Sequence, residues 1–260
     1  MAEITPNFRL EGRIAFVSGA AGHLGRAIAH ALSEAGAHLV LNGRDESRLK
    51  DFAKTLRSAE CAAFDVSDFP AVRKFFESRD RIDVIVNNAI SMTPKPRDRL
   101  APEDFDQTYR SSVTAAFEIT RAALPALRNA VKASGDASII NIASMYAAVS
   151  PDARIYAKPE QASPFHYGPA KAALIQLTRH LAAELGPERI RVNALVPGPF
   201  PRPEVQANDP QFAERLAAKT MLGRLGKSDE IAGPVQFLAS PASSFVTGSA
   251  VAVDGGWTAW

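Results

Sequence analysis

Short apolar runs alternate with longer amphipathic stretches along almost the whole chain. The apolar runs are typical of strands buried in a parallel sheet, and the amphipathic stretches are typical of helices that pack on such a sheet. We predict strands at 14–18, 38–42, 60–64, 82–87, 138–142, 191–195 and 250–253. The predicted helices are 24–35, 46–57, 69–78, 102–132, 164–185, 210–218 and 228–239.

This order predicts an α/β fold, with a single doubly wound domain over residues 1–260 and a seven-stranded parallel sheet flanked by helices. Ligands of such sheets bind beyond the carboxyl ends of the strands. The irregular stretches 90–100, 145–162 and 197–209 each follow a predicted strand. We therefore expect them to form the walls of one binding site.

The sequence does not decide where the predicted helix 164–185 begins, because Pro164 and Pro169 permit different first residues. Ser163 and Pro164 form a typical N-cap and first-turn pair. If the helix begins there, Pro169 lies inside it, removes a backbone hydrogen bond and kinks the helix near Tyr167.

Composition and charge exclude several classes of protein. Hydrophobic residues make up 46% of the chain and charged residues 22%, as in ordinary globular proteins. The formal net charge is only +2 and the cations are scattered, so no nucleic-acid partner is expected. The lone Cys61 excludes an intramolecular disulfide, and no spacing of His or Cys indicates a metal site. We expect a cytoplasmic protein that acts on a small molecule, without a secretion signal or a membrane span.

A glycine-rich segment predicts a dinucleotide-binding turn. Gly19, Gly22 and Gly25 follow the first predicted strand and open the first predicted helix. Glycine permits a tight turn and lets backbone N–H groups approach a pyrophosphate at the helix N-terminus. In this strand–turn–helix context the spacing indicates a Rossmann-type site.

The ends of the second and third strands bear on the choice of cofactor. NAD-preferring sites place an acid where this chain has Asn42 and Gly43. Arg44 can instead pair with a 2′-phosphate, so NADP is favoured and NAD stays possible. The alternative for Arg44 is a solvated turn residue. Asp65 and Val66 either contact the adenine or cap the following helix.

Tyr167 and Lys171 carry the candidate chemistry. Residues four apart share one face of a helix, so the hydroxyl and the ammonium can converge. A free phenol has a pKa of about 10, and a nearby cation lowers that pKa, which makes a tyrosine usable as an acid/base. Ser144, at the end of a predicted strand, supplies a second donor for an oxygen on which charge develops. Alternatively, Lys171 is a surface lysine and Ser144 bonds only to backbone.

The ordered set of motifs resembles the short-chain dehydrogenase/reductase family over nearly the whole chain. Besides the glycine turn and the Ser, Tyr and Lys just described, the set includes Asp65, Asn87-Asn88-Ala89, Pro197-Gly198 and Val253-Asp-Gly-Gly256. The resemblance implies a nicotinamide cofactor and the oxidation of an alcohol or the reduction of a carbonyl. It also implies a homotetramer or homodimer.

The resemblance implies a role for each matching residue. Ser144 holds the substrate oxygen, Tyr167 passes the proton, and Lys171 lowers the pKa of the tyrosine and binds the nicotinamide ribose. Ser112 stands where an Asn usually anchors a proton-relay water, and a Ser holds such a water less well. The residues expected to contact the cofactor are Gly19, Gly22, His23, Leu24, Gly25, Arg44, Asp65, Val66, Asn87, Ala89, Lys171, Pro197 and Gly198.

Three further departures from the family pattern are visible. His23 stands where the commonest subgroup has its second Gly, and Pro199-Phe200-Pro201 replaces the Thr that often follows Pro-Gly. The separation between Ser144 and Tyr167 is longer than usual, with the extra residues at 147–162. We expect that insertion to loop out over the pocket.

The charges of the expected site walls favour an anionic, polyhydroxylated substrate. We expect Arg154 and Arg202 to bind its carboxylate together. The insertion and the C-terminal segment 255–260 resemble the gluconate 5-dehydrogenase-like group, which supports a sugar acid or a polyol. The alternative is that these cations are solvated loop charges. The cations in question are Lys95, Arg97, Arg99, Arg154, His166 and Arg202.

Two other functions stay open. A 3-oxoacyl-thioester reductase belongs to the same class of enzyme. A cofactor-binding scaffold with little or no turnover is suggested by Ser112 and His23, whereas the intact set of Ser144, Tyr167 and Lys171 argues against it.

Overall fold

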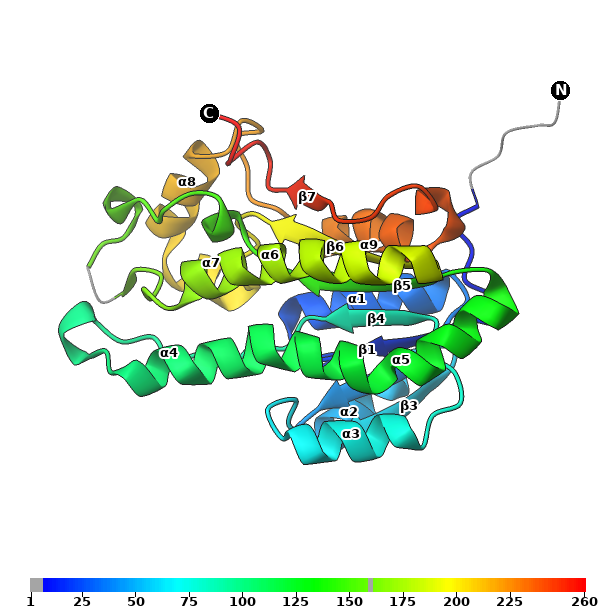
Figure 1. The fold of residues 1–260 in the computed structure, drawn as a ribbon. Helices are drawn as coiled ribbons and strands as arrows, with labels where there is room; N and C mark the ends of the chain where they lie inside the picture. The colour runs from blue at the N-terminus through cyan, green and yellow to red at the C-terminus, as the bar shows by residue number, and fades with distance from the viewer. Residues whose placement is uncertain (1–6, 159–160) are drawn as a thin grey trace, which may run out of the picture.

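Seven parallel strands form one sheet in the order β3-β2-β1-β4-β5-β6-β7 (Figure 1). This computed structural model describes residues 7–158 and 161–260. The predicted α/β fold is confirmed, and every predicted strand is present with its ends within two residues of the prediction. The strands are β1 (Ile14–Val17), β2 (His38–Gly43), β3 (Ala59–Ala63), β4 (Val84–Asn87), β5 (Ala137–Ile142), β6 (Ile190–Pro197) and β7 (Ala250–Val253).

The two faces of the sheet carry separate hydrophobic cores. In β1, Ala15 and Val17 enter one core and Phe16 enters the other, because successive residues of a strand point to opposite faces. Figure 1 shows α5 and α6 on one face, with α1 and α9 on the other. The first core is covered by α1 (His23–Glu34), α2 (Glu46–Ala53) and α9 (Ala232–Ala239), and the second by α3 (Phe69–Glu77), α5 (Ala115–Ser134) and α6 (Tyr167–Leu185).

The predicted helix 102–132 is continuous but contains one turn of π-helix. α4 (Pro102–Tyr109) leads into this turn at Arg110–Thr114, and α5 follows it. The backbone carbonyl of Thr108 accepts hydrogen bonds from the hydroxyls of Ser111 (3.3 Å) and Ser112 (2.6 Å). The two serines therefore stabilise the widened turn, a feature that is frequent at functional sites.

Several helix ends differ from the prediction. α2 ends at Ala53 rather than at residue 57. Thr55, just beyond the helix, donates its hydroxyl proton to the Phe52 carbonyl (2.8 Å), a local bond that competes with helical hydrogen bonding. α6 begins at Tyr167 rather than at Pro164, so Pro169 lies in its first turn, where its missing N–H removes no helical bond.

The C-terminal helices also correct the prediction in part. Part of the predicted loop 197–209 is helical, as α7 (Pro203–Asn208), and α8 (Pro210–Ala218) matches its prediction. The predicted helix 228–239 divides into a 3₁₀ turn at Ser228–Ile231 and α9. Within the described part of the chain, no helix is long and apolar enough to cross a membrane.

Candidate active site

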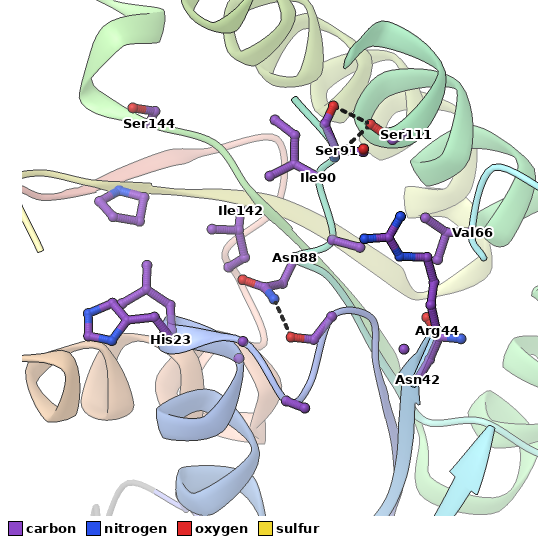
Figure 2. A pocket seen from close by; sticks show the side chains of 18 of the residues that line it. His23, Asn42, Arg44, Val66, Asn88, Ile90, Ser91, Ser111, Ile142 and Ser144 are labelled. Carbon is purple, nitrogen blue, oxygen red and sulfur yellow. Dashed lines mark hydrogen bonds between the residues drawn. The ribbon is translucent and has the colours of Figure 1, made fainter. Parts of the chain in front are cut away.

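A cavity of about 580 Å³ opens beyond the carboxyl ends of β1 to β6. It lies where the strand order reverses between β1 and β4, which is where doubly wound sheets bind ligands. Figure 2 shows His23, Arg44 and Ser144 arranged around it. Of the residues predicted for the site, the cavity is lined by Gly19, Gly22, His23, Leu24, Gly25, Arg44, Asp65, Val66, Ala89, Ser144, Tyr167, Lys171, Pro197, Gly198 and Arg202.

The glycine turn is built for close backbone packing. Gly19 has φ +63°, a conformation that favours glycine. A Cβ on Gly25 would collide with the Gly19 carbonyl oxygen. The N-cap residue of α1 is Gly22, which has no side chain to cover the first amides of the helix. The first backbone N–H groups of α1 are thus free to bind an anion in the cavity, which fits a dinucleotide pyrophosphate.

His23 faces the same cavity as the first residue of α1. Its Nε2 atom is buried and has no hydrogen-bond partner among the described residues. Burial and the neighbouring Arg202 lower the pKa of His23, so the imidazole is neutral near pH 7. An unpaired buried nitrogen beside the glycine turn is consistent with a ligand that supplies its partner.

Arg44 and Asp65 lie together at the β2–β3 end of the cavity. The Nη1 atom of Arg44 is 3.8 Å from Oδ2 of Asp65, and the Arg44 side chain is 73% exposed. Asp65 also accepts a hydrogen bond from the backbone N–H of Ser67 (2.8 Å), so it caps the following turn while its other oxygen faces Arg44. Asp45 instead caps α2 by accepting from the Arg48 N–H (3.0 Å), and Arg48 adds a second cation to the cavity wall.

Ser144 and Tyr167 meet at the opposite end of the cavity. Both residues line the cavity although 23 positions separate them, so the insertion does loop out. Burial raises the pKa of Tyr167 above its ordinary value, and the neighbouring Ser144 hydroxyl lowers that pKa by less. Tyr167 is therefore a protonated phenol at neutral pH.

Lys171 is buried one helical turn after Tyr167. Its Nζ donates to the Ile142 carbonyl (2.6 Å) and lies 5.8 Å from the centre of the Tyr167 ring. Burial lowers the pKa of Lys171 to about 8. The expected lowering of the tyrosine pKa by Lys171 is not seen, because in this arrangement the ammonium is held on β5 and the burial of Tyr167 dominates.

Comparisons with known proteins agree with this geometry. A family described as Enoyl-(Acyl carrier protein) reductase matches residues 19–258. The rhamnolipids biosynthesis 3-oxoacyl-(acyl-carrier-protein) reductase of Pseudomonas aeruginosa is 36% identical over 97% of this chain and 98% of that protein. The chain belongs to the short-chain dehydrogenase/reductase family. The predicted resemblance is thus confirmed.

Two solved structures of this family lie close to the present fold. A gluconate 5-dehydrogenase from Burkholderia cenocepacia, in complex with NADP and tartrate, has a TM-score of 0.84 and 33% identity over 98% of each chain. A short-chain type dehydrogenase/reductase from Mycobacterium marinum has a TM-score of 0.83 and 30% identity over 97% of each chain.

Two predicted residues of this short-chain dehydrogenase/reductase lie beside the cavity rather than on its wall. Asn87 is buried and donates to Asn141 (2.8 Å), so it holds β4 to β5, and its predicted contact with the cofactor stays a prediction. Ser112 directs its hydroxyl to the Thr108 carbonyl, and Ser111 lines the cavity in its place. The site residues that the sequence did not reveal include Ser111 and Asn88, whose side chain donates to the Ser18 (3.0 Å) and Gly19 (3.2 Å) carbonyls.

Arg154 also lies away from the cavity, which corrects its predicted role. Its guanidinium makes two hydrogen bonds to Asp152, through Nε (2.9 Å) and Nη2 (2.8 Å), and 86% of its side chain is exposed. Lys219 of the segment after α8 binds the same carboxylate (2.9 Å). The charge of Arg154 is therefore neutralised within its own loop.

The described part of the insertion packs beside the site instead of covering it. The hydroxyls of Tyr146 and Tyr156 are 2.9 Å apart, and Ile155 packs with Leu216 of α8 and with Trp257. None of its described residues lines the cavity, so the predicted loop is present but its predicted position over the pocket is wrong. Residues 159 and 160 of the insertion lie outside the described residues.

One of the six predicted wall cations, Arg202, lines the cavity. Lys95 is bound to Asp104 (2.6 Å) and His166 to Thr108 (3.0 Å). Arg97 and Arg99 form a separate 3₁₀ turn. A substrate carboxylate therefore has one of these cations available on the described wall, rather than a pair.

Proposed function

We propose that this protein is an NADP-dependent oxidoreductase that interconverts an alcohol and a carbonyl on a sugar acid or a related polyol. The observation that carries the proposal is that Ser144 and Tyr167, with Lys171 one turn away, line one end of a cavity whose other end is a glycine turn. A scaffold without turnover has no need of a buried lysine and a buried serine beside a tyrosine on the wall of the cavity.

The side chains fit the reduction of a carbonyl. Ser144 and Tyr167 present two hydroxyl donors to one oxygen, so they stabilise negative charge that develops there. The raised pKa of Tyr167 keeps its proton available for that oxygen. A nicotinamide cofactor bound in the cavity would supply the hydride. In the opposite direction the phenolate of Tyr167 would accept the proton of an alcohol.

The residues present also fit the cofactor. The open N-terminus of α1 would hold the pyrophosphate, Asp65 and Val66 would border the adenine, and Ala89, Lys171, Pro197 and Gly198 would border the nicotinamide riboside. Arg44 and Arg48 lie at the β2 end of the cavity, and of the two acids that follow β2, Asp45 caps α2 and Glu46 pairs with Lys50 (2.8 Å). Two cations and a capped acid favour a 2′-phosphate. The structure of the gluconate 5-dehydrogenase relative holds NADP.

The substrate is inferred from Arg202 and from the relatives. Arg202 lines the cavity and has no ion-pair partner among the described residues, so a carboxylate can bind to it. The tartrate in the gluconate 5-dehydrogenase structure is a hydroxy acid of the kind proposed.

The test compares an acidic with a neutral substrate. We expect Arg202→Gln to raise KM for 5-oxogluconate by about tenfold, equivalent to about 1.4 kcal/mol, with kcat nearly unchanged and a neutral ketose unaffected. Arg154→Gln is the matched control, because its guanidinium is engaged outside the cavity. Equal effects of Arg202→Gln on both substrates, or equal effects of the two variants, would contradict the proposed charge recognition.

A second candidate is a 3-oxoacyl-thioester reductase. It is favoured by the 36% identity to the Pseudomonas enzyme, and it needs the same Ser144, Tyr167 and Lys171. NADPH oxidation with acetoacetyl-CoA, measured beside 5-oxogluconate, separates the two: a larger kcat/KM for the thioester replaces the first candidate by the second.

The assembly and the location belong to the same proposal. Exposed phenylalanines on the α4–α6 side, Phe105 (36%), Phe117 (41%) and Phe165 (59%), support a homodimer or homotetramer. Light scattering on the purified protein tests this, and a monomer would contradict it. We also propose a cytoplasmic location, which the lone Cys61 supports and cell fractionation tests.

A further inference from the structure

His166, the residue immediately before Tyr167, is completely buried. Its Nδ1 atom lies 3.0 Å from the hydroxyl of Thr108, which is also completely buried, and the ring of Phe105 meets the imidazole edge to face at 5.7 Å. The backbone carbonyl of His166 accepts from the Ala170 N–H (3.3 Å) as α6 begins. His166 thus joins the start of the catalytic helix to α4.

Thr108 connects this histidine to the cavity wall. Its hydroxyl is 3.3 Å from the Ser91 carbonyl, and its own carbonyl accepts from Ser111 and Ser112 of the π-turn. The Ser91 N–H donates to the Ser111 hydroxyl (2.9 Å), a pair that Figure 2 shows on the wall of the cavity. One buried threonine therefore contacts the loop after β4, the π-turn and the residue before Tyr167.

One tautomer of His166 satisfies both contacts of the Thr108 hydroxyl. The Thr108 hydroxyl has one proton, and when it donates this proton to Ser91 its oxygen accepts from the Nδ1–H of His166. The Nε2 atom is then an acceptor, buried and without a partner among the described residues. An apolar ring would fill the same space without that unsatisfied nitrogen, so the hydrogen bond to Thr108 is the feature that a histidine adds here.

We propose that His166 is a positioning residue that, through Thr108, holds Tyr167 in register with Ser144 and with the loop after β4. This inference rests on the proposed function, because it takes Tyr167 as the proton carrier. The phenol must lie within about 2.6–3.2 Å of the atom that receives its proton. A displacement of about 1 Å at the start of α6 costs on the order of a hundredfold in rate.

The proposal is tested by conservative and disruptive substitutions of each partner in the hydrogen bond between His166 and Thr108. His166→Asn places a polar atom near the position of Nδ1, whereas His166→Phe keeps the ring and removes the bond. We expect His166→Phe to lower kcat for the reduction of 5-oxogluconate or acetoacetyl-CoA by about 10- to 100-fold, with the Kd of NADPH unchanged. His166→Asn should retain kcat within about threefold. Thr108→Val should reproduce the loss, Thr108→Ser should not, and the double variant with His166→Phe should be no slower than either single variant.

A spectroscopic measurement follows the position of Tyr167 without substrate or cofactor. The chain has 4 tyrosines, so ¹³C labelling of tyrosine and comparison with Tyr167→Phe assign the resonance of Tyr167. We expect that resonance to shift or broaden in His166→Phe and in Thr108→Val, and to return to its original position in His166→Asn. If His166→Phe does not fold, Thr108→Val and Thr108→Ser supply the same contrast.

The outcomes separate this inference from the proposed function. An unchanged Tyr167 resonance together with full kcat in His166→Phe or Thr108→Val, while Tyr167→Phe is inactive, overturns the positioning role and leaves the proposed function intact. Equal losses in His166→Asn and His166→Phe would also overturn it, because packing alone would then explain both. Full activity of Tyr167→Phe would instead remove the proposed function.

Discussion

At the scale of single residues, we propose that Arg44 favours one of two cofactors that differ by one phosphate. Its exposed guanidinium lies 3.8 Å from the Asp65 carboxylate, a contact weak enough for a 2′-phosphate to replace. We predict that Arg44→Ala weakens NADPH binding by about tenfold, near the low end of the roughly 1.5–3 kcal/mol of a charge-assisted bond, and leaves NADH binding unchanged. Fluorescence titration measures both, with Arg154→Ala as the control. An unmutated protein that binds NADH as tightly as NADPH would refute the preference.

Lys171 couples the site to pH through its burial. Its pKa in the folded protein is about 8, below the ordinary value of 10.5. Between these two values the unfolded chain binds more protons than the folded one, so this residue makes the free energy of unfolding rise with pH across that window. Below pH 8 both states are protonated and the cost of the buried charge is fully present.

We therefore predict that the stability of the unmodified protein rises relative to Lys171→Met between about pH 8 and pH 10. Urea unfolding of both proteins at pH 7 and pH 9.5 measures the difference, and groups that titrate elsewhere cancel in the comparison. Parallel pH dependences would show that Lys171 is not desolvated as the structure indicates.

The sequence predicted three residues that line the cavity but not which of two adjacent, similar residues faces it. Ser144, Tyr167 and Lys171 were predicted from helical spacing and the end of a strand together with the resemblance to the family. The sequence pointed to Asn87 and Ser112 rather than to their neighbours Asn88 and Ser111, which line the cavity. A shift of one residue along a strand or across a π-turn changes the direction of a side chain but not the residue type, so the sequence carries no signal for the choice. Arg154 could not be judged without knowing that Asp152 would bind it.

At the scale of elements, the start of α6 is fitted against the turn that holds Ser144. A Cβ on Gly168 would lie 2.8 Å from the Tyr146 carbonyl oxygen, closer than real Cβ contacts. We predict that Gly168→Ala pushes α6 away from the turn at Met145–Ala147 and lowers kcat by at least tenfold, with the Kd of NADPH nearly unchanged.

Gly186→Ala, at the other end of the same helix, is the matched control. Its Cβ would meet nothing within 4 Å and its φ is −55°, so an alanine fits there without strain. Steady-state kinetics on both variants should separate them clearly. Similar activity of the two alanine variants would mean that the contact with Tyr146 does not set the position of Tyr167.

Helix and strand positions were largely predictable from periodicity, whereas helix ends were decided by contacts. Pro164 and Pro169 both permit a helix start, and the choice of Tyr167 places Pro169 in the first turn. The short helix α7 was missed because a six-residue segment with two neighbouring prolines lacks a helical apolar pattern.

At the scale of the whole molecule, the candidate active site and a cluster of ion pairs around Asp136 lie at opposite edges of the sheet. The carboxyl edge carries the cavity, whereas near the amino edge Asp136 binds the buried Arg13 (2.6 Å) and Arg191 (3.1 Å). The α/β class followed from the alternation of segments. The insertion was assigned to the cavity from its place in the sequence, but Ile155 and Tyr156 find apolar partners on α8 and at the C-terminal segment, and these long-range contacts carry no local signal.

The central claim is that the hydroxyl of Tyr167 carries the proton in a hydride-transfer reaction. Tyr167→Phe removes only that hydroxyl, so single-turnover oxidation of bound NADPH by 5-oxogluconate or acetoacetyl-CoA tests the claim most directly. The predicted result is a rate at least about 10²-fold lower than that of the unmodified protein, with an unchanged Kd for NADPH. A Tyr167→Phe variant that turns over at the rate of the unmodified protein would contradict the account, because another group would then be moving the proton.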